Sequence, residues 1–102
     1  MKVAILGSGN GAHAAAFEWS RAGHEVWMFD FPQFDVIRGI AQKGGIECRG
    51  EMEGFAPIAY AGSEIDRVLE GAELIIAVGP AYSTEPFAKA CKPYAKEGQV
   101  FV

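Results

Sequence analysis

Short apolar runs alternate along the chain with segments in which apolar residues recur every three or four positions. The runs at residues 3–6 and 74–78 have no polar alternation, which is typical of strands buried on both faces of a parallel sheet. Residues 25–29 are β-branched and aromatic, which favours another strand. Between the runs at residues 3–6 and 25–29, residues 12–22 have helical spacing, and this segment ends at Gly23. The pattern predicts a strand, helix, strand unit of about thirty residues.

The middle of the chain carries a weaker pattern. We expect a short helix over residues 34–43, interrupted at Gly39. Glycines with apolar residues between them predict a small hairpin or extended excursion over residues 46–55. A third strand is expected over residues 58–60. Ser63 followed by Asp66 resembles a capping box, so the next helix would run to Glu70 and stop at the following glycine.

The end of the chain predicts one more helix and strand. Thr84 is the expected N-cap of a helix with Pro86 in its first turn, and Pro93 should end or kink that helix. Residues 100–102 begin a last apolar strand. The whole pattern predicts an α/β fold, a Rossmann-like doubly wound parallel sheet that is incomplete at the C-terminus.

Composition limits the class of protein and its partners. With 102 residues, half of them apolar and 22% charged, we expect one folded domain over residues 1–102. The net charge of −4 lacks the basic field on which nucleic-acid binding relies. Cys48 and Cys91 have neither metal-ligand nor CxxC spacing, and no apolar run approaches the roughly 20 residues of a membrane span. We therefore expect a cytoplasmic protein without a metal site or a membrane segment.

One motif carries the chemistry. It fits the pattern GxGxxA, lies between a buried strand and a helix, and consists of Gly7, Ser8, Gly9, Asn10, Gly11 and Ala12. In a dinucleotide site Gly7 makes the tight turn, Gly9 lets the backbone approach a pyrophosphate, and Ala12 allows close helix packing. The first helical turn would direct its free N–H groups at the phosphates. The alternative is a glycine turn that only packs a helix on a sheet.

An acidic residue about twenty positions further on bears on the choice of cofactor. Asp30 would accept hydrogen bonds from the adenosine ribose and repel the additional phosphate of NADP. Phe31, Pro32 and Gln33 offer no positive charge to offset that repulsion, and we place Phe31 beside the cofactor too. The pattern predicts NAD. NADP stays open as an alternative, because Arg38 is a nearby cation that could move in to offset the charge of the additional phosphate.

Other polar and turn residues have two interpretations each. Gly79 and Pro80 follow a predicted strand, so they would lie beside the cofactor or form an ordinary strand-to-helix turn. His13 would donate to the pyrophosphate, or it would lie on the surface or support the site without touching the cofactor. His24 is expected to be a solvated loop residue. We treat both cysteines as structural, because no neighbouring residue in the sequence would activate a thiolate.

The residues around this motif resemble a known family. Residues 5–14 and 22–26, together with Asp30, look like the start of the opine (octopine/nopaline) dehydrogenases. Their N-terminal NAD-binding domain is in turn similar to those of glycerol-3-phosphate dehydrogenase and ketopantoate reductase. The similarity extends weakly through residues 45–46, 54, 65–71, 78–81 and 98–100. It implies hydride transfer from NAD(P)H to an imine formed between a 2-oxo acid and an amino acid.

The resemblance also implies a role for each matching residue. The pyrophosphate loop would be Gly7, Gly9, Asn10, Gly11 and Ala12, with Asp30 at the ribose and Gly79-Pro80 near the nicotinamide. In that family the groups that polarise the substrate come from a separate helical domain. We therefore expect a domain fragment that binds cofactor, contains no catalytic residue and is not catalytic alone. An exposed last strand would favour self-association as a homo-oligomer.

Two other functions remain open. A stand-alone NAD-sensing regulatory domain would share the glycine motif and the terminal acid, but would close its sheet and carry its own dimer surface. An S-adenosylmethionine site also uses a similar loop, but it does not call for a small Ala12 or for Gly79-Pro80. The excursion between residues 43 and 58 favours the dehydrogenase.

Overall fold

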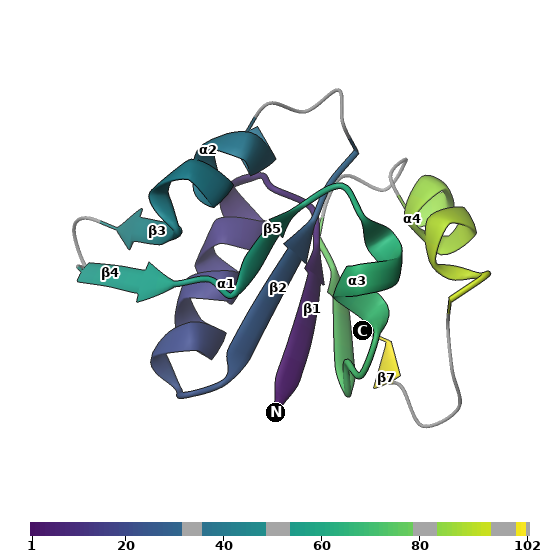
Figure 1. Cartoon of the computed structure of the whole chain (residues 1–102), viewed down its shortest axis with the longest axis horizontal. Helices are drawn as coiled ribbons and strands as arrows, with labels where there is room; N and C mark the ends of the chain where they lie inside the picture. The colour runs from purple at the N-terminus through teal and green to yellow at the C-terminus, as the bar shows by residue number, and fades with distance from the viewer. Residues whose placement is uncertain (32–35, 49–53, 79–83, 95–99, 102) are drawn as a thin grey trace.

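A parallel sheet of five strands carries the fold (Figure 1). The structure is a computed structural model that describes residues 1–31, 36–48, 54–78, 84–94 and 100–101. The strand order is β5-β2-β1-β6-β7, and all neighbouring pairs are parallel. The strands are β1 (Lys2–Leu6), β2 (Glu25–Phe29), β5 (Tyr60–Gly62), β6 (Leu74–Ala77) and β7 (Val100–Phe101). Strand β1 thus lies between β2 and β6. The predicted Rossmann-like class of the sheet is confirmed.

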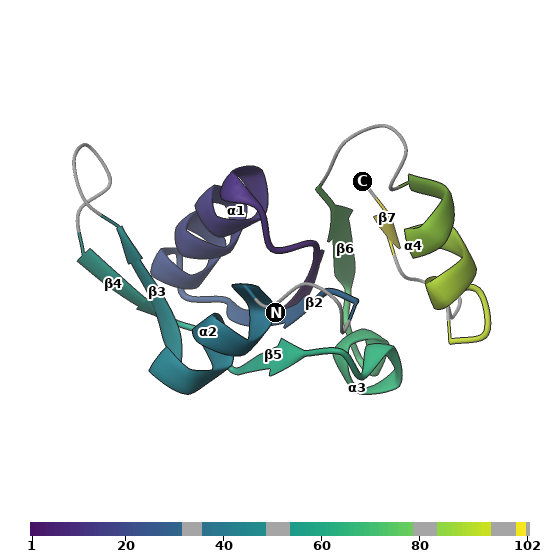
Figure 2. The same ribbon diagram turned by 90° about the horizontal axis from the view of Figure 1, so that it is seen from above.

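In the described parts of the chain, four helices and a hairpin cover the two faces of this sheet. They are α1 (Asn10–Arg21), α2 (Val36–Lys43), α3 (Ile65–Leu69), α4 (Thr84–Cys91) and the antiparallel pair β3 (Gly45–Cys48) and β4 (Gly54–Pro57). Side chains of α1, α2 and the hairpin pack together on one face, while α3 and α4 pack on the other. Figures 1 and 2 show the hairpin and α4 at opposite ends of the molecule. The expected hairpin is thus confirmed.

Strand β1 explains why its sequence shows no polar alternation. Val3 and Ile5 enter the core on the α1 side, whereas Ala4 and Leu6 enter the core on the α3 side. All four side chains are essentially inaccessible to solvent. A central strand with helices on both faces has no wet side, so each of its positions must be apolar. This strand is therefore enclosed on four sides, by the two neighbouring strands and by the helices on both faces of the sheet.

Several boundaries differ from those that the sequence predicts. Helix α1 begins two residues earlier, at Asn10, and α2 runs through Gly39 without interruption. A Gly inside a helix costs about 1 kcal/mol; burial of Ile37 and Ile40 in the core offsets this. The third strand is β5, displaced by two residues from the prediction, because its pairing with β2 begins at Tyr60. Residues 34 and 35 lie outside the described residues.

The predicted capping box is wrong. Helix α3 begins at Ile65 with Glu64 as its N-cap, and no side chain caps it. The carbonyl of Glu64 accepts the first hydrogen bonds, from the N–H groups of Arg67 and Val68. Ser63 therefore lies one residue too early to cap the helix. Thr84 is likewise the first residue of α4 rather than its N-cap, whereas α4 ends two residues before Pro93 as expected.

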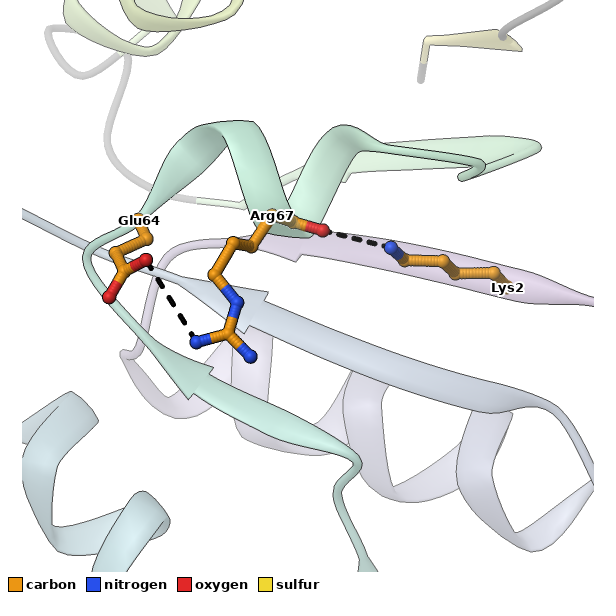
Figure 3. A network of polar contacts seen from close by, with 3 residues as sticks. All are labelled: Lys2, Glu64 and Arg67. Carbon is orange, nitrogen blue, oxygen red and sulfur yellow. Dashed lines mark hydrogen bonds and ion pairs between the residues drawn. The ribbon is translucent and has the colours of Figure 1, made fainter.

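The short helix α3 is held by a lysine from the first strand (Figure 3). The ammonium of Lys2 donates to the carbonyl of Arg67 at 2.9 Å and also to the carbonyl of Glu70, and it lies 3.9 Å from the centre of the Trp27 ring. These carbonyls belong to the last turn of the helix and have no partner within it. The pKa of Lys2 lies below its usual value, because desolvation lowers it more than the nearby Glu25 and Glu70 raise it. The exposed Arg67–Glu64 pair at 3.9 Å contributes little by comparison.

No helix within the described ranges has the length and apolar character that crossing a membrane requires.

Replacing Lys2 by Met should lower the free energy of unfolding by about 1 kcal/mol, because two helix carbonyls lose a charged donor at a partly exposed site. Urea denaturation followed by circular dichroism measures this change. Lys43→Met is the matched control: that lysine is exposed in the last turn of α2, and its replacement should change the stability by less than about 0.5 kcal/mol. Equal effects of the two substitutions would contradict a specific role for Lys2.

Candidate functional site

Gly7 turns the chain from β1 toward α1 in a conformation that only glycine adopts easily. Its φ is +125°, and a Cβ atom there would overlap the carbonyl oxygen of Val78. Its N–H donates to the carbonyl of Phe29 at 2.7 Å, which continues the pairing of β1 with β2 beyond the last strand residue. The turn is therefore fixed between both neighbouring strands. The predicted role of Gly7 in a tight turn agrees with this geometry.

The next two glycines differ in what surrounds them. A Cβ on Gly11 would approach Cγ1 of Val78 to 2.8 Å, so this glycine lets α1 pack against the end of β6. Ala12 is fully buried in the core beneath the helix. Gly9 has an ordinary extended backbone, with φ −78° and ψ −172°, and a Cβ there would meet no atom of the described residues within 4 Å. The fold itself gives no steric reason for glycine at position 9.

The N-terminus of α1 lies at the same place. Gly9 is the N-cap of this twelve-residue helix, no side chain caps it, and its first turn contains no acidic residue. The first amides of a helix have no carbonyl partner within it, and the helix dipole places partial positive charge there. The open space over Gly9 therefore borders amides that can donate to an anion. The side chain of Asn10 lies outside the described part of the structure.

Asp30 is fixed at the end of β2, beside this loop. The residue is 6% exposed. Oδ2 accepts from the hydroxyl of Ser8 at 2.5 Å, and Oδ1 accepts from the N–H of Phe31 at 2.8 Å. A carboxylate has about four acceptor sites, so both oxygens retain capacity for further donors. The bond from Ser8 is a contact that the sequence analysis missed. The contact follows from the strand register. Leu6 pairs with Phe29, so Ser8 and Asp30, which come shortly after these two residues, emerge at the same end of the sheet.

His13 stabilises the loop from within α1. Its Nδ1 lies 2.9 Å from the carbonyl oxygen of Gly9, which also accepts the backbone N–H of His13 at 2.9 Å. Because a carbonyl oxygen can only accept, Nδ1 must carry the proton in this contact. The ring also lines a cavity of about 250 Å³ between α1, α2 and β3. The contact anchors the N-cap carbonyl and is compatible with either predicted role of His13.

Three other residues from the sequence analysis have less to do with this site. The prediction of a solvated His24 is wrong: the residue is half-buried, its ring packs against Trp19 at 5.2 Å, and its Nδ1 is enclosed without a partner in the described structure. Cys91 is buried, and burial raises the pKa of its thiol, which opposes a nucleophilic role. The side chain of Cys48 is not among those described.

Two parts of the predicted site cannot be placed. Gly79 and Pro80 lie outside the described residues. Val78 directly precedes them. Its carbonyl oxygen lies next to Gly7 and its side chain next to Gly11, so the chain at the end of β6 borders the glycine loop. Among the described residues, no group of three or more His, Cys, Asp or Glu side chains could hold a metal ion.

A glycine turn, an uncapped helix and a strand-terminal acid at the carboxyl edge of a parallel sheet define a Rossmann-like domain. Comparison with known proteins agrees. The chain is 31% identical over 100 residues to an opine dehydrogenase of Arthrobacter sp. (strain 1C), a match that covers 97% of the chain and 28% of that protein.

Solved structures show the same fold. A PanE/ApbA family ketopantoate reductase from Ralstonia eutropha JMP134 is 26% identical, with a TM-score of 0.77 over 99% of this chain and 33% of that one. An octopine dehydrogenase solved with NADH and pyruvate is 23% identical, with a TM-score of 0.82 over 99% of this chain and 28% of that one. No family model matches the chain. The predicted resemblance to opine dehydrogenases is confirmed, and the chain spans about 28% of the length of the curated relative that it matches.

Substituting the glycines should separate those that the fold needs from the one that it does not. Gly7→Ala should lower the free energy of unfolding by more than about 2 kcal/mol, because it combines a positive φ with overlap on a carbonyl. Gly9→Ala, the matched control, should cost less than about 1 kcal/mol, a typical N-cap effect. Urea denaturation of both variants tests this contrast, and similar losses in the two would contradict it.

Proposed function

We propose that this chain is the dinucleotide-binding domain of an NAD-dependent dehydrogenase of the opine type. One observation carries the proposal: the open space over Gly9 borders the uncapped N-terminus of α1, beside the fixed carboxylate of Asp30. The donors suit a pyrophosphate and the acceptors suit the ribose of an adenosine. The similarity to an opine dehydrogenase supports a dehydrogenase, and the octopine dehydrogenase of the same fold was solved with NADH.

Each residue of the predicted site has a role in this proposal. Gly9 admits the pyrophosphate to the backbone, and the amides of the first turn donate to it. Gly7 and Gly11 shape the loop, while Asp30 accepts from the ribose hydroxyls and Ser8 holds that carboxylate in place. The full proposed set is Gly7, Ser8, Gly9, Asn10, Gly11, Ala12, Asp30, Phe31, Gly79 and Pro80.

The proposed cofactor is NAD rather than NADP. A fixed, buried carboxylate at the ribose hydroxyls repels a 2′-phosphate, and desolvation makes that repulsion stronger than it would be in water. When bound, the cofactor supplies the hydride, and this domain binds and orients it. The proposed substrate is a small acid of the opine class. We propose that the groups acting on it belong to the part of such a dehydrogenase that this chain does not match.

Gly9→Val should abolish NADH binding while the domain stays folded. The new side chain would occupy the open space over the loop, and an extended backbone accepts a β-branched residue without strain. Thermal melting with and without NADH measures both effects, since a ligand that binds the native state raises the midpoint. The parent chain should show the shift and the variant should not. A variant that melts like the parent and still responds to NADH would refute the proposed site.

Asp30→Asn should weaken NADH binding by about tenfold and raise the affinity for NADPH relative to NADH. The amide keeps the size of the carboxylate but loses the charge that repels a 2′-phosphate and accepts strongly from the ribose. Calorimetric titration with both dinucleotides gives the ratio. Glu73→Gln is the matched control, because it removes the same charge at an exposed position just before β6, at the other end of the strands. An unchanged ratio in Asp30→Asn would exclude that residue from the ribose site.

A further inference from the structure

A cavity of about 250 Å³ lies between α1, α2 and β3, on the face of the sheet opposite α3 and α4. Figures 1 and 2 show these three elements at the end of the molecule away from α4. One side of α2 lines the cavity along the whole helix, with residues three, four and seven positions apart: Val36, Gly39, Ile40 and Lys43. The other lining residues are His13, Gly45, Ile46 and Glu47. None of them belongs to the proposed dinucleotide site.

Gly39 is an unfavourable residue at its position, and the described part of the fold does not require it. It lies inside α2, where only proline is a poorer helix former. Its φ is not positive, and an added Cβ would meet no atom of the described residues within 4 Å. Gly45 differs, because a Cβ there would overlap the Phe55 ring and the carbonyl oxygen of Ala56. Gly39 therefore keeps open a wall of the cavity that any side chain would fill.

The cavity has aliphatic walls and a size suited to a small molecule. Ile40 and Ile46 are buried, whereas Val36 is 52% exposed, so the cavity is open to solvent beside the first turn of α2. The ring of His13 forms the wall on the α1 side and is fixed by its bond to the carbonyl of Gly9. A cavity of about 150 Å³ admits benzene, so this one admits roughly six to ten non-hydrogen atoms.

The charges at the cavity favour an anion over a cation. Lys43 and Glu47 both line it and are both exposed. Glu47 already has an interaction partner, which offsets its charge. The ammonium of Lys43 forms no hydrogen bond or ion pair with any residue that the structure describes. The uncompensated charge is thus positive, while the nearby Glu47 carboxylate opposes a ligand that carries a second negative charge.

We propose that this cavity binds a short aliphatic monocarboxylate, with its carboxylate at Lys43 and its hydrocarbon chain over Gly39 and against Ile40 and Ile46. The branched acid isovalerate has the size and the single charge that the cavity suits. This ligand site is separate from the dinucleotide site, so the chain would bind two different small molecules on α1-side surfaces that share only the support of His13.

Titration of the nitrogen-15-labelled chain with isovalerate, followed by the amide shifts in NMR spectra, tests the site. Isovalerate should bind with a millimolar dissociation constant, as expected of so small a ligand. It should shift the amides of Gly39, Ile40 and Ile46 and leave those of Ser8 and Asp30 unchanged. Isovaleramide, which has the same shape without the charge, and methylsuccinate, which has a second carboxylate, should each bind about fivefold more weakly. Equal or tighter binding of isopentylamine would overturn the anion site.

Two pairs of variants separate ligand binding from folding. Gly39→Leu fills the cavity and replaces glycine by a good helix former, so it should abolish isovalerate binding and raise the thermal midpoint by about 4 °C. Ala41→Leu, at an exposed position of α2 outside the cavity, should bind isovalerate like the parent. Lys43→Met should weaken isovalerate by about fivefold, whereas Lys92→Met, just after α4, should not. Unchanged affinity in Gly39→Leu would overturn the proposed site.

Saturating NADH separates this site from the proposed function. Isovalerate should bind equally well with and without NADH, because the two sites share no lining residue. Displacement of isovalerate by NADH would overturn the separate site, since it would place the carboxylate in the glycine loop. Isovalerate binding by a parent chain that does not bind NADH would support the cavity site and overturn the dinucleotide site. Absence of shifts around the cavity at about 50 mM isovalerate would overturn the cavity site alone.

Discussion

The close approach of the β1–α1 turn to the end of β6 is the constraint on which the site depends. Gly7 passes against the carbonyl of Val78, and Gly11 passes against the side chain of the same residue. A Cβ at either position would overlap Val78. Because both residues are glycine, the chain can turn directly from the central strand into α1. The N-terminus of the helix is thereby held over the carboxyl edge of the sheet. Its first amides have no side-chain cap, and they adjoin Gly9, where no atom of the described residues lies within 4 Å of an added Cβ.

A second consequence of this turn is the bond between Ser8 and Asp30. The parallel register of β1 and β2 brings the residue after the first glycine beside the residue after the neighbouring strand. The resulting hydrogen bond, together with that from the N–H of Phe31, orients both carboxylate oxygens in a nearly buried position. Charge-assisted bonds of this kind offset part of the desolvation of the carboxylate. The groups proposed to meet the pyrophosphate and the ribose are thus built as one rigid unit.

Patterns local to a strand or helix could be predicted from the sequence, whereas contacts between distant elements could not. The runs of β1 and β6 identify buried strands, and the glycine loop with Asp30 predicts the place of the site, because each signal lies within a few residues. The N-cap of α3 could not be predicted from the Ser63 pattern, because tertiary contacts hold this short helix: Val68 and Leu69 are buried in the core, and Lys2, 65 residues before Arg67, binds carbonyls of its last turn. The stacking of Phe31 on Phe87 and the burial of His24 likewise depend on tertiary contacts.

The structure changes what the glycine motif itself means. A run of glycines is ambiguous in a sequence, since each residue could serve the backbone, the packing or a ligand. Here Gly7 is explained by its φ and Gly11 by the neighbouring Val78, so both would be needed in a domain that binds nothing. Gly9 has neither explanation among the described residues, because its backbone is ordinary and none of their atoms lies within 4 Å of an added Cβ. A packing turn requires only Gly7 and Gly11, so it is Gly9 that argues for a ligand at this edge of the sheet.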